Sequence, residues 1–262
     1  MPKVPPESEP PLVSVLFITC NRAQTLVATV ESFVHRVTYP RDRLELILCD
    51  DASDRWHRSI SDRLAFDKTV RAATNVGLGA NQNAGMRAAR GKFILTLQDD
   101  CMLTGDGDFL HRTVTAMMAD PTISMVAYRE RPELPVLERR TVAGESLVIY
   151  GTALDARGCG DYAYSDQPNV KRADFHDAVG WFQEGVPMMT MELDFQKRVA
   201  ADASLRVAAL TVTDPFTHIG AVFTLNAAQL IAQKLERIYA LPILGPAYRA
   251  IRTAARQVLR GQ

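Results

Sequence analysis

The sequence lacks several features that mark other classes of protein. It has no apolar run of the roughly 20 residues that a membrane-spanning helix needs, and its best run covers only residues 12–18. A proline-rich, acidic start before that short run does not fit a signal peptide, so we expect a cytoplasmic protein. The four cysteines form no CxxC or CxxH pair. This spacing argues against a disulfide framework and against a zinc site.

The sequence also has no excess of charge of either sign, since 30 basic residues balance 30 acidic ones. A dedicated nucleic-acid binder normally carries a basic surplus, so we expect no nucleic-acid partner. With 47% apolar and 23% charged residues, the chain has enough hydrophobic material for a packed core. Disorder as the dominant state is therefore excluded.

What the sequence does contain is an alternation of apolar runs and helical patterns. Nearly unbroken apolar runs predict buried strands at 12–18, 44–49, 68–73, 93–97 and 123–128. Apolar residues at helical spacing predict helices at 23–37, 55–64, 81–90 and 109–119. This alternation is typical of an α/β fold with a Rossmann-like, doubly wound, mostly parallel sheet flanked by helices.

The alternation stops after residue 129. The segment 155–167 is rich in Gly, Asp and Tyr, which predicts a mobile loop, and helices are expected at 173–179 and 193–201. Two amphipathic helices are expected at 225–239 and 247–260. We therefore expect a proline-rich disordered tail at 1–11, one domain at 12–222 with halves at 12–128 and 129–222, and a C-terminal helical extension at 223–262.

Polar side chains follow three of the predicted strands directly. Thr19 and Asn21 follow the first, residues 50–54 the second, and the pair Asp99 and Asp100 the strand at 93–97. Ligands bind beyond the carboxyl ends of the strands in such sheets. Two adjacent carboxylates at the end of a buried strand repel each other, and a divalent cation such as Mg²⁺ or Mn²⁺ would relieve that cost. The alternative is that one of them caps the next helix or turn.

Taken together and in order, the motifs resemble the family 2 glycosyltransferases of the GT-A fold. The matching pieces are Val15-Leu-Phe-Ile-Thr-Cys-Asn-Arg22, Asp50-Asp-Ala-Ser-Asp54, Asn75-x-Gly77 with Asn83-x-Gly85, Gln98-Asp-Asp100, Arg172-x-x-Phe-x-x-x-Val-Gly-Trp-Phe-x-Glu184 and Glu192-Leu-Asp-Phe-x-x-Arg198. The resemblance extends over about residues 13–220. It implies an inverting transferase that moves a sugar from a nucleotide-diphosphate donor to a hydroxyl acceptor, which would be a glycan, a lipid-linked sugar or a small molecule.

The resemblance also implies roles for single residues. Asp100 and His218 would bind the divalent cation, Mn²⁺ or Mg²⁺, and Glu192 would be the catalytic base. Trp181, Phe182 and Asp194 would lie on the acceptor side. The donor would be bound by Thr19, Asn21, Arg22, Asp50, Asp51, Ser53, Asn75, Gly77, Asn83, Gln98 and Asp99.

Several of these residues have structural alternatives. Glu192 would be favoured at a helix start by the helix dipole alone, Trp181 and Phe182 would suit core packing, and Asp194 would suit pairing with Arg198 four residues later.

Two residues depart from the family pattern. Gln98 stands where the family has the first acid of its DxD motif, and Gln82 stands where relatives usually have arginine. These departures favour the alternative of a degenerate GT-A module that binds a nucleotide or a partner without turnover. A sugar nucleotidyltransferase is a further alternative, although the glycine- and arginine-rich phosphate loop that it needs is missing after the first strand.

The last predicted helix has a basic stripe of Arg249, Arg252, Arg256 and Arg260. Basic amphipathic helices often lie on anionic membranes, so peripheral contact with the inner face of the membrane is one interpretation. A solvated face on a docked helix is the other.

Overall fold

The computed structural model describes residues 9–220, apart from 129–130, 132–133, 155–159, 162, 203 and 211–213. The chain divides into two compact units, Met1–Ile219 and Gly220–Gln262. The helices and strands of the described residues belong to the first unit. The helices expected at 225–239 and 247–260, with their basic stripe, lie outside the described residues, as does most of the expected tail at 1–11.

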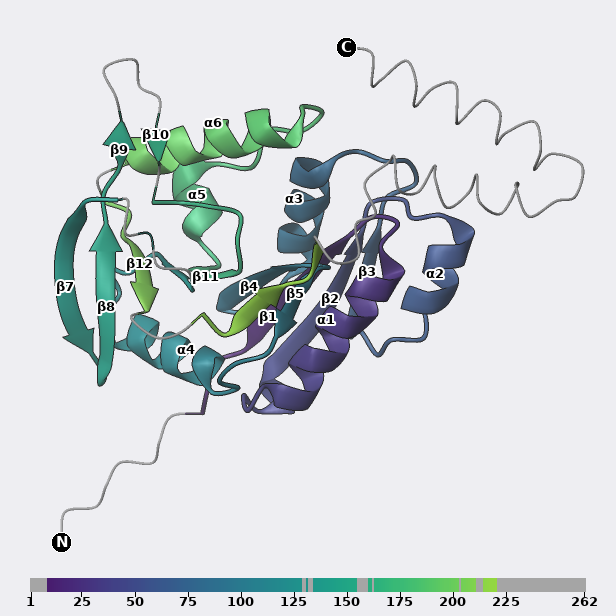
Figure 1. The fold of residues 1–262 in the computed structure, drawn as a ribbon, viewed down its shortest axis with the longest axis horizontal. Coiled ribbons are helices and arrows are strands. Elements are labelled where there is room, and N and C mark those ends of the chain that lie inside the picture. Colours follow the sequence, from purple (N-terminus) through teal and green to yellow (C-terminus); the bar gives the residue numbers. More distant parts are fainter. Residues whose placement is uncertain are drawn as a thin grey trace, which may run out of the picture. The chain divides into compact units, whose positions relative to one another are not determined.

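One half of the central sheet consists of four parallel strands in the order β3, β2, β1, β4. These strands are β1 (Val13–Thr19), β2 (Leu44–Asp50), β3 (Lys68–Arg71) and β4 (Phe93–Gln98). All residues of β1 and β2 are buried, as expected for strands that are covered on both faces. The predicted α/β fold with a mostly parallel central sheet flanked by helices is confirmed, and Figure 1 shows this arrangement.

The sheet continues beyond β4 as β11, β6, β12, β8 and β7, which makes nine strands among the described residues. β11 is antiparallel to both of its neighbours, β12 is parallel to β6, and β7 and β8 form an antiparallel hairpin. Their bounds are β6 (Met125–Ala127), β7 (Val136–Val142), β8 (Glu145–Tyr150), β11 (Asn169–Arg172) and β12 (Val207–Leu210). Of these strands, sequence reasoning predicted only β6. The strand β7 is mostly exposed and β11 carries two basic residues, so neither has an unbroken apolar run, whereas β8 and β12 are short runs that do end in buried apolar residues.

Helices cover both faces of the sheet (Figure 1). One core packs α1 (Ala23–Arg36) and α4 (Phe109–Ala119) against the sheet, and the other packs α3 (Leu78–Ala88), α5 (Phe175–Val179) and α6 (Met188–Ala201). The helix expected at 193–201 begins earlier, after Pro187. Shorter elements are η1 (Arg41–Arg43), α2 (Arg55–Ser61), the pair β9 (Ala153–Leu154) and β10 (Gly160–Asp161), and the pair β5 (Cys101–Leu103) and β13 (Phe216–His218).

Glycine allows α3 to approach the sheet closely. A Cβ on Gly85 would lie 2.3 Å from the sulfur of Cys49 on β2, too close for any other residue without a shift. Gly77, just before α3, has a φ of 88°, in the region that favours glycine. The two glycines therefore fix where α3 begins and how deeply it packs.

None of the helices in the described part of the chain has the length and apolar character needed to cross a membrane.

Candidate active site

The parallel register brings three polar strand ends to one edge of the sheet. Thr19 of β1 pairs with Asp50 of β2, and Ile18 pairs with Gln98 at the end of β4. Asp99 and Asp100 follow Gln98 directly. The polar residues expected at the carboxyl edge are thus neighbours in the structure.

Asp99 and Asp100 form a buried carboxylate pair with one shared cationic partner. Arg22 places one guanidinium nitrogen 3.1 Å from Asp99 Oδ1 and the other 2.7 Å from Asp100 Oδ2. Thr19 donates its hydroxyl to Asp99 Oδ2 at 2.7 Å. Burial raises the pKa of Asp99 to about 6, although Thr19 and Arg22 oppose the shift. The negative charge at this edge is therefore only partly neutralised.

His218 reaches this carboxylate pair from a strand distant in sequence. β13 pairs with β5 so that His218 is opposite Cys101, and His218 Nε2 lies 3.3 Å from Asp100 Oδ1. Ligand atoms of Asp100, Cys101 and His218 all lie within 4.8 Å of one another. Carboxylate oxygen and imidazole nitrogen are both suitable ligands for Mn²⁺. The residues therefore fit a divalent cation.

The loop after β2 is held by its own side chains. Asp50 accepts one hydrogen bond from the Ser53 amide at 2.9 Å and another from Arg71 Nε at 2.7 Å. The main-chain amide of Asn21 donates to Ser53 Oγ at 2.8 Å. The side-chain oxygen of Asn21 accepts the main-chain amide of Asp54 at 2.7 Å. These contacts join the loops that follow β1 and β2 and give both a fixed shape.

Asp51 holds the segment before α3. Its two carboxylate oxygens accept the amides of Val76 at 2.7 Å and Gly77 at 3.0 Å. Asn75, next to this segment, is exposed, and its side chain donates to Cys20 Sγ at 3.3 Å. Several of the residues predicted to bind the donor thus hold the shape of the loops after β1 and β2 and before α3.

Asn83 and Phe182 are core residues in the structure. Asn83 is fully buried, and its side-chain amide donates to the Phe182 carbonyl and to Glu184 Oε1, while its oxygen accepts the Phe182 amide. The Phe182 ring packs against Phe195 with centroids 4.3 Å apart, and the residue is 2% exposed. For Phe182, the packing alternative replaces the expected stacking on a sugar, because its ring has no open face.

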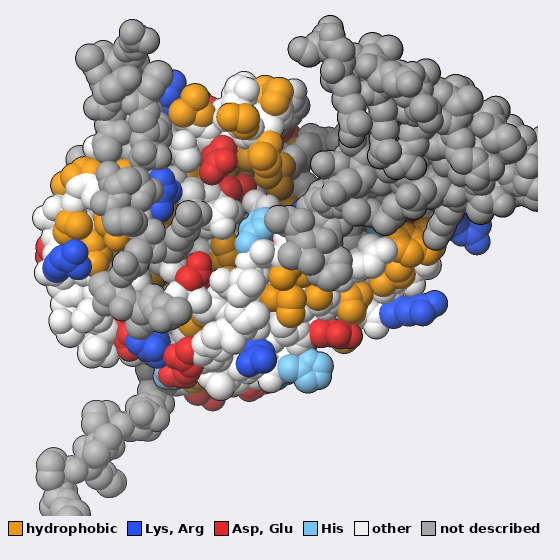
Figure 2. Space-filling view, viewed as in Figure 1, with side chains coloured by type: hydrophobic (Ala, Val, Ile, Leu, Met, Phe, Trp, Pro, Cys, Tyr) orange, Lys and Arg blue, Asp and Glu red, His pale blue; other side chains and the backbone are white. Residues whose placement is uncertain are grey.

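Glu192 is a partly buried residue of α6, one turn from the start of the helix. Its Oε1 accepts the amide of Asp166 at 3.2 Å, and partial burial, followed by the nearby charge of Asp166, raises its pKa. Asp194 pairs with Arg198 at 2.8 Å, as the four-residue spacing predicts. Glu192 lies beside the exposed side chains of Met189 and Leu193, and Figure 2 shows apolar and acidic side chains together over α6.

Asp166 is the site residue that sequence reasoning missed, because it lies in the segment expected to be a mobile loop. It is 7% exposed. Gln82 Nε2 and the Tyr164 hydroxyl donate to its carboxylate, and Gln98 Nε2 donates to its carbonyl at 3.4 Å. Gln82, which departs from the family pattern, thus has a partner within the fold. No local pattern in the sequence marks Asp166.

Comparison with known proteins decides the family. A sequence profile described as glycosyl transferase family 2 matches residues 14–163. The chain belongs to this family. The resemblance seen in the sequence is therefore confirmed.

Solved structures of glycosyltransferases share its fold. A mannosyltransferase of Pyrobaculum calidifontis in complex with GDP-Man and Mn²⁺ has 21% identity and a TM-score of 0.54 over 75% of this chain and 56% of that one. Residues 1–349 of S. aureus TarS in complex with UDP-GlcNAc have 19% identity and a TM-score of 0.57 over 78% of this chain and 57% of that one. This chain thus spans little more than half of each. No curated protein matches it.

Trp181 stays accessible near α6. It is 38% exposed, its ring stacks on His176 with centroids 5.5 Å apart, and the Arg87 guanidinium lies 4.6 Å from its centroid. Burial, together with the nearby charge of Lys171, lowers the pKa of His176 to about 3, so His176 is a neutral support for the indole.

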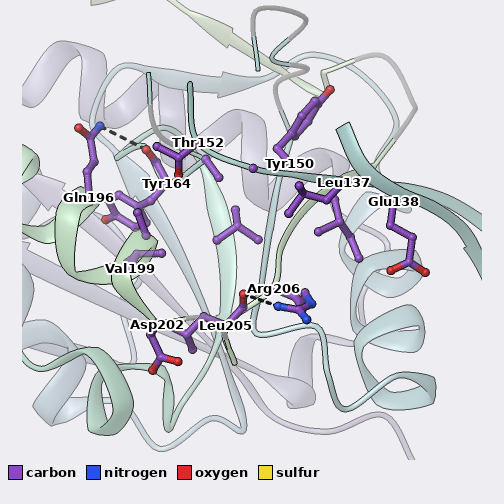
Figure 3. A pocket seen from close by; sticks show the side chains of 15 residues that line it. Leu137, Glu138, Tyr150, Thr152, Tyr164, Gln196, Val199, Asp202, Leu205 and Arg206 are labelled. Atoms are coloured by element: carbon purple, nitrogen blue, oxygen red, sulfur yellow. Dashed lines mark hydrogen bonds between the residues drawn. The ribbon is translucent and has the colours of Figure 1, made fainter. Parts of the chain in front are cut away.

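A cavity of about 580 Å³ lies away from the carboxylate edge, between the hairpin of β7 and β8 and the end of α6 (Figure 3). Of the described residues that line it, none belongs to the predicted site. Tyr164, whose hydroxyl donates to Asp166, forms part of its wall, and its carbonyl accepts from Gln196.

Proposed function

We propose that this glycosyltransferase inverts the anomeric centre of a nucleotide-diphosphate sugar, with help from a divalent cation and with Glu192 as the base. One observation carries the proposal. A chain of hydrogen bonds runs from Gln98, which precedes the carboxylate pair, through the carbonyl and amide of Asp166 to Glu192 Oε1. This connection between the acidic strand edge and the carboxylate on α6 supports their assignment to one site.

On the donor side, Asp100 and His218 would hold the cation, Mn²⁺ or Mg²⁺. Their ligand atoms are 3.3 Å apart, and the His218 side chain is half exposed. When bound, a divalent cation would supply positive charge for the departing diphosphate. Arg22, whose side chain is 33% exposed, would supply the same charge from the chain itself. The GDP-Man and Mn²⁺ in the mannosyltransferase structure support this assignment.

The reaction needs one proton acceptor. The acceptor hydroxyl oxygen bonds to the anomeric carbon as the bond from that carbon to the diphosphate oxygen breaks, and the electron pair of that bond stays on the diphosphate. The hydroxyl proton goes to the Glu192 carboxylate. A raised pKa makes this carboxylate a better proton acceptor while it is ionised.

The acceptor would lie against α6, where Glu192 borders a cavity of about 570 Å³ together with Gln183, Met189, Thr190, Leu193 and Asp194. Trp181, which is 38% exposed, would contact the acceptor. The proposal includes three alternative classes of hydroxyl acceptor, namely a glycan, a lipid-linked sugar and a small molecule. Peripheral membrane contact through the C-terminal basic helix would suit the second of them.

A panel of nucleotide sugars tests the proposal, beginning with GDP-mannose and UDP-GlcNAc. Release of nucleoside diphosphate is measured with MnCl₂, with MgCl₂ and with a chelator, and thermal shifts by the free diphosphates are measured in parallel. Release that depends on the cation and is lost in Glu192→Gln supports the transferase. Thermal shifts without release from any donor would favour the binding-only module that Gln98 suggests.

A further inference from the structure

We infer that Asp166 is a positioning residue for Glu192, an inference that rests on the proposed function because it assigns Glu192 as the base. Asp166 would hold the Glu192 carboxylate in one orientation through its main chain and keep the proton affinity of Glu192 high through its charge. The segment that contains it thereby becomes part of the reaction site.

The side chain of Asp166 is anchored from two directions. Gln82 Nε2, on α3, donates to Oδ2 at 2.7 Å, and the Tyr164 hydroxyl donates to Oδ1 at 3.0 Å. Gln82 and Tyr164 are almost completely buried, so both donors are themselves fixed by packing. The Asp166 side chain is short and both of its carboxylate oxygens accept hydrogen bonds. The main chain of Asp166 therefore has little freedom to move.

That main chain is what contacts Glu192. The Asp166 amide donates to Glu192 Oε1 at 3.2 Å, and the Asp166 carbonyl accepts from Gln98 at 3.4 Å. One peptide segment thus joins α6 to the end of β4. Displacing a catalytic group by about 1 Å can lower the reaction rate about a hundredfold. These two hydrogen bonds are therefore suited to setting the position of the base.

The charge of Asp166 has a cationic counterpart in the core. Lys171, on β11, is completely buried, and its Nζ has no hydrogen-bond partner among the described residues. Burial lowers the pKa of Lys171 to about 8, and the charge of Asp166 opposes that shift. Loss of the negative charge of Asp166 would therefore disfavour the charged form of Lys171 further.

Several groups set the proton affinity of Glu192. Burial and the negative charge of Asp166 raise the pKa of Glu192, while the Asp166 amide and the positive charge of Arg131 lower it. The Tyr164 phenol also faces Glu192, and Asp194 and Lys197 border the same cavity. Asp166 both raises the pKa of Glu192 through its charge and donates its main-chain amide to the Glu192 carboxylate.

Two variants of Asp166 separate its charge from its anchoring. Asp166→Asn removes the charge with little change in volume, and we expect it to lower the pKa of Glu192, because the repelling charge is gone. Asp166→Ala removes the anchor as well, and we expect turnover to fall by about tenfold to a hundredfold, with diphosphate affinity within twofold. Tyr164→Phe removes one anchoring hydrogen bond and gives a smaller loss of the same kind.

The matched control is Glu45→Gln. Glu45 is another buried carboxylate, which accepts hydrogen bonds from Ser14 and Arg90 near the opposite edge of the sheet. Its substitution lowers the unfolding temperature and leaves the pKa of Glu192 unchanged.

The pKa of Glu192 is measured by carbon-13 NMR titration of the Glu side-chain carboxyls in the full chain, with Glu192→Gln to assign the signal. This measurement needs no donor. If the wild type turns over no sugar nucleotide, the proposed function fails while the titration still tests the coupling of Asp166 to Glu192. The inference is overturned if Glu192 titrates at the same pH in the wild type and in Asp166→Asn, or if turnover in Asp166→Ala falls no more than in Glu45→Gln.

Discussion

Replacing Glu192 by Gln should remove turnover and leave the site otherwise intact. Gln keeps the size of the side chain and an oxygen that can accept the Asp166 amide, which now lies 3.2 Å from Oε1. It cannot take the proton of the acceptor hydroxyl. A positioned base contributes about 10²–10⁴ in rate, so turnover should fall at least about a hundredfold, which is about 3 kcal/mol of barrier.

The same substitution should not weaken the fold at neutral pH. The pKa of Glu192 is raised in the folded state, chiefly by burial, so the folded state binds its proton at pH values where the unfolded state has lost it. Stability therefore falls as the pH rises through that window, and the folded state carries the cost of the charge above it. Glu192→Gln removes this cost, so its unfolding temperature at a mildly alkaline pH should equal or exceed that of the wild type.

Asp194→Asn is the matched control, two residues further along α6. Asp194 pairs with Arg198 through contacts of 2.8 and 2.9 Å, but both side chains are about a third or more exposed. Solvent screening limits such a pair to at most about 1 kcal/mol, which corresponds to a fall in unfolding temperature of about 2–4 °C. The substitution should cost mainly stability, and turnover should fall far less than in Glu192→Gln.

Diphosphate release under saturating donor, isothermal calorimetry of the diphosphate with Mn²⁺, and thermal unfolding give the three readouts. The assignment of the base is refuted if Asp194→Asn is folded and inactive while Glu192→Gln keeps its turnover. It is equally refuted if the two variants lose activity only in proportion to their loss of stability.

Three further outcomes are expected. Asp100→Ala should weaken diphosphate binding in Mn²⁺, because it removes a candidate metal ligand whose Oδ1 lies 3.3 Å from His218 Nε2. In chelator the diphosphate affinity should change little. Equal calorimetric affinity of the variant and the wild type in Mn²⁺ would contradict this. Gly85→Ala should destabilise the fold by about 1–3 kcal/mol, because its Cβ would lie 2.3 Å from the Cys49 sulfur; an unchanged midpoint in urea would show that α3 shifts freely. If the arginine stripe binds a membrane, deleting residues 247–262 should abolish flotation with anionic vesicles and spare donor hydrolysis. A truncated protein that unfolds, or that still floats with the vesicles, would favour a docked helix.

The sequence by itself determined the parallel half of the sheet and the position of its acidic edge. The apolar runs at 12–18, 44–49 and 93–97 are local signals, and residues that directly follow parallel strands must meet at one edge. Local pattern alone therefore places Thr19, Asp50 and Asp99 at that edge. The pairing of Asp194 with Arg198 is equally local, since four residues make about one helical turn.

Only the tertiary structure decided which residues from distant segments complete the site. His218 reaches Asp100 because β13 pairs with β5, and no periodicity in the sequence encodes that pairing. Asp166 lies among Gly, Asp and Tyr residues that predict a loop, and its role depends on Gln82 and Glu192 packing around it. A turn-rich segment has no pattern of its own to identify such contacts. They are fixed by the packing of α3 and α6 on the same face of the sheet.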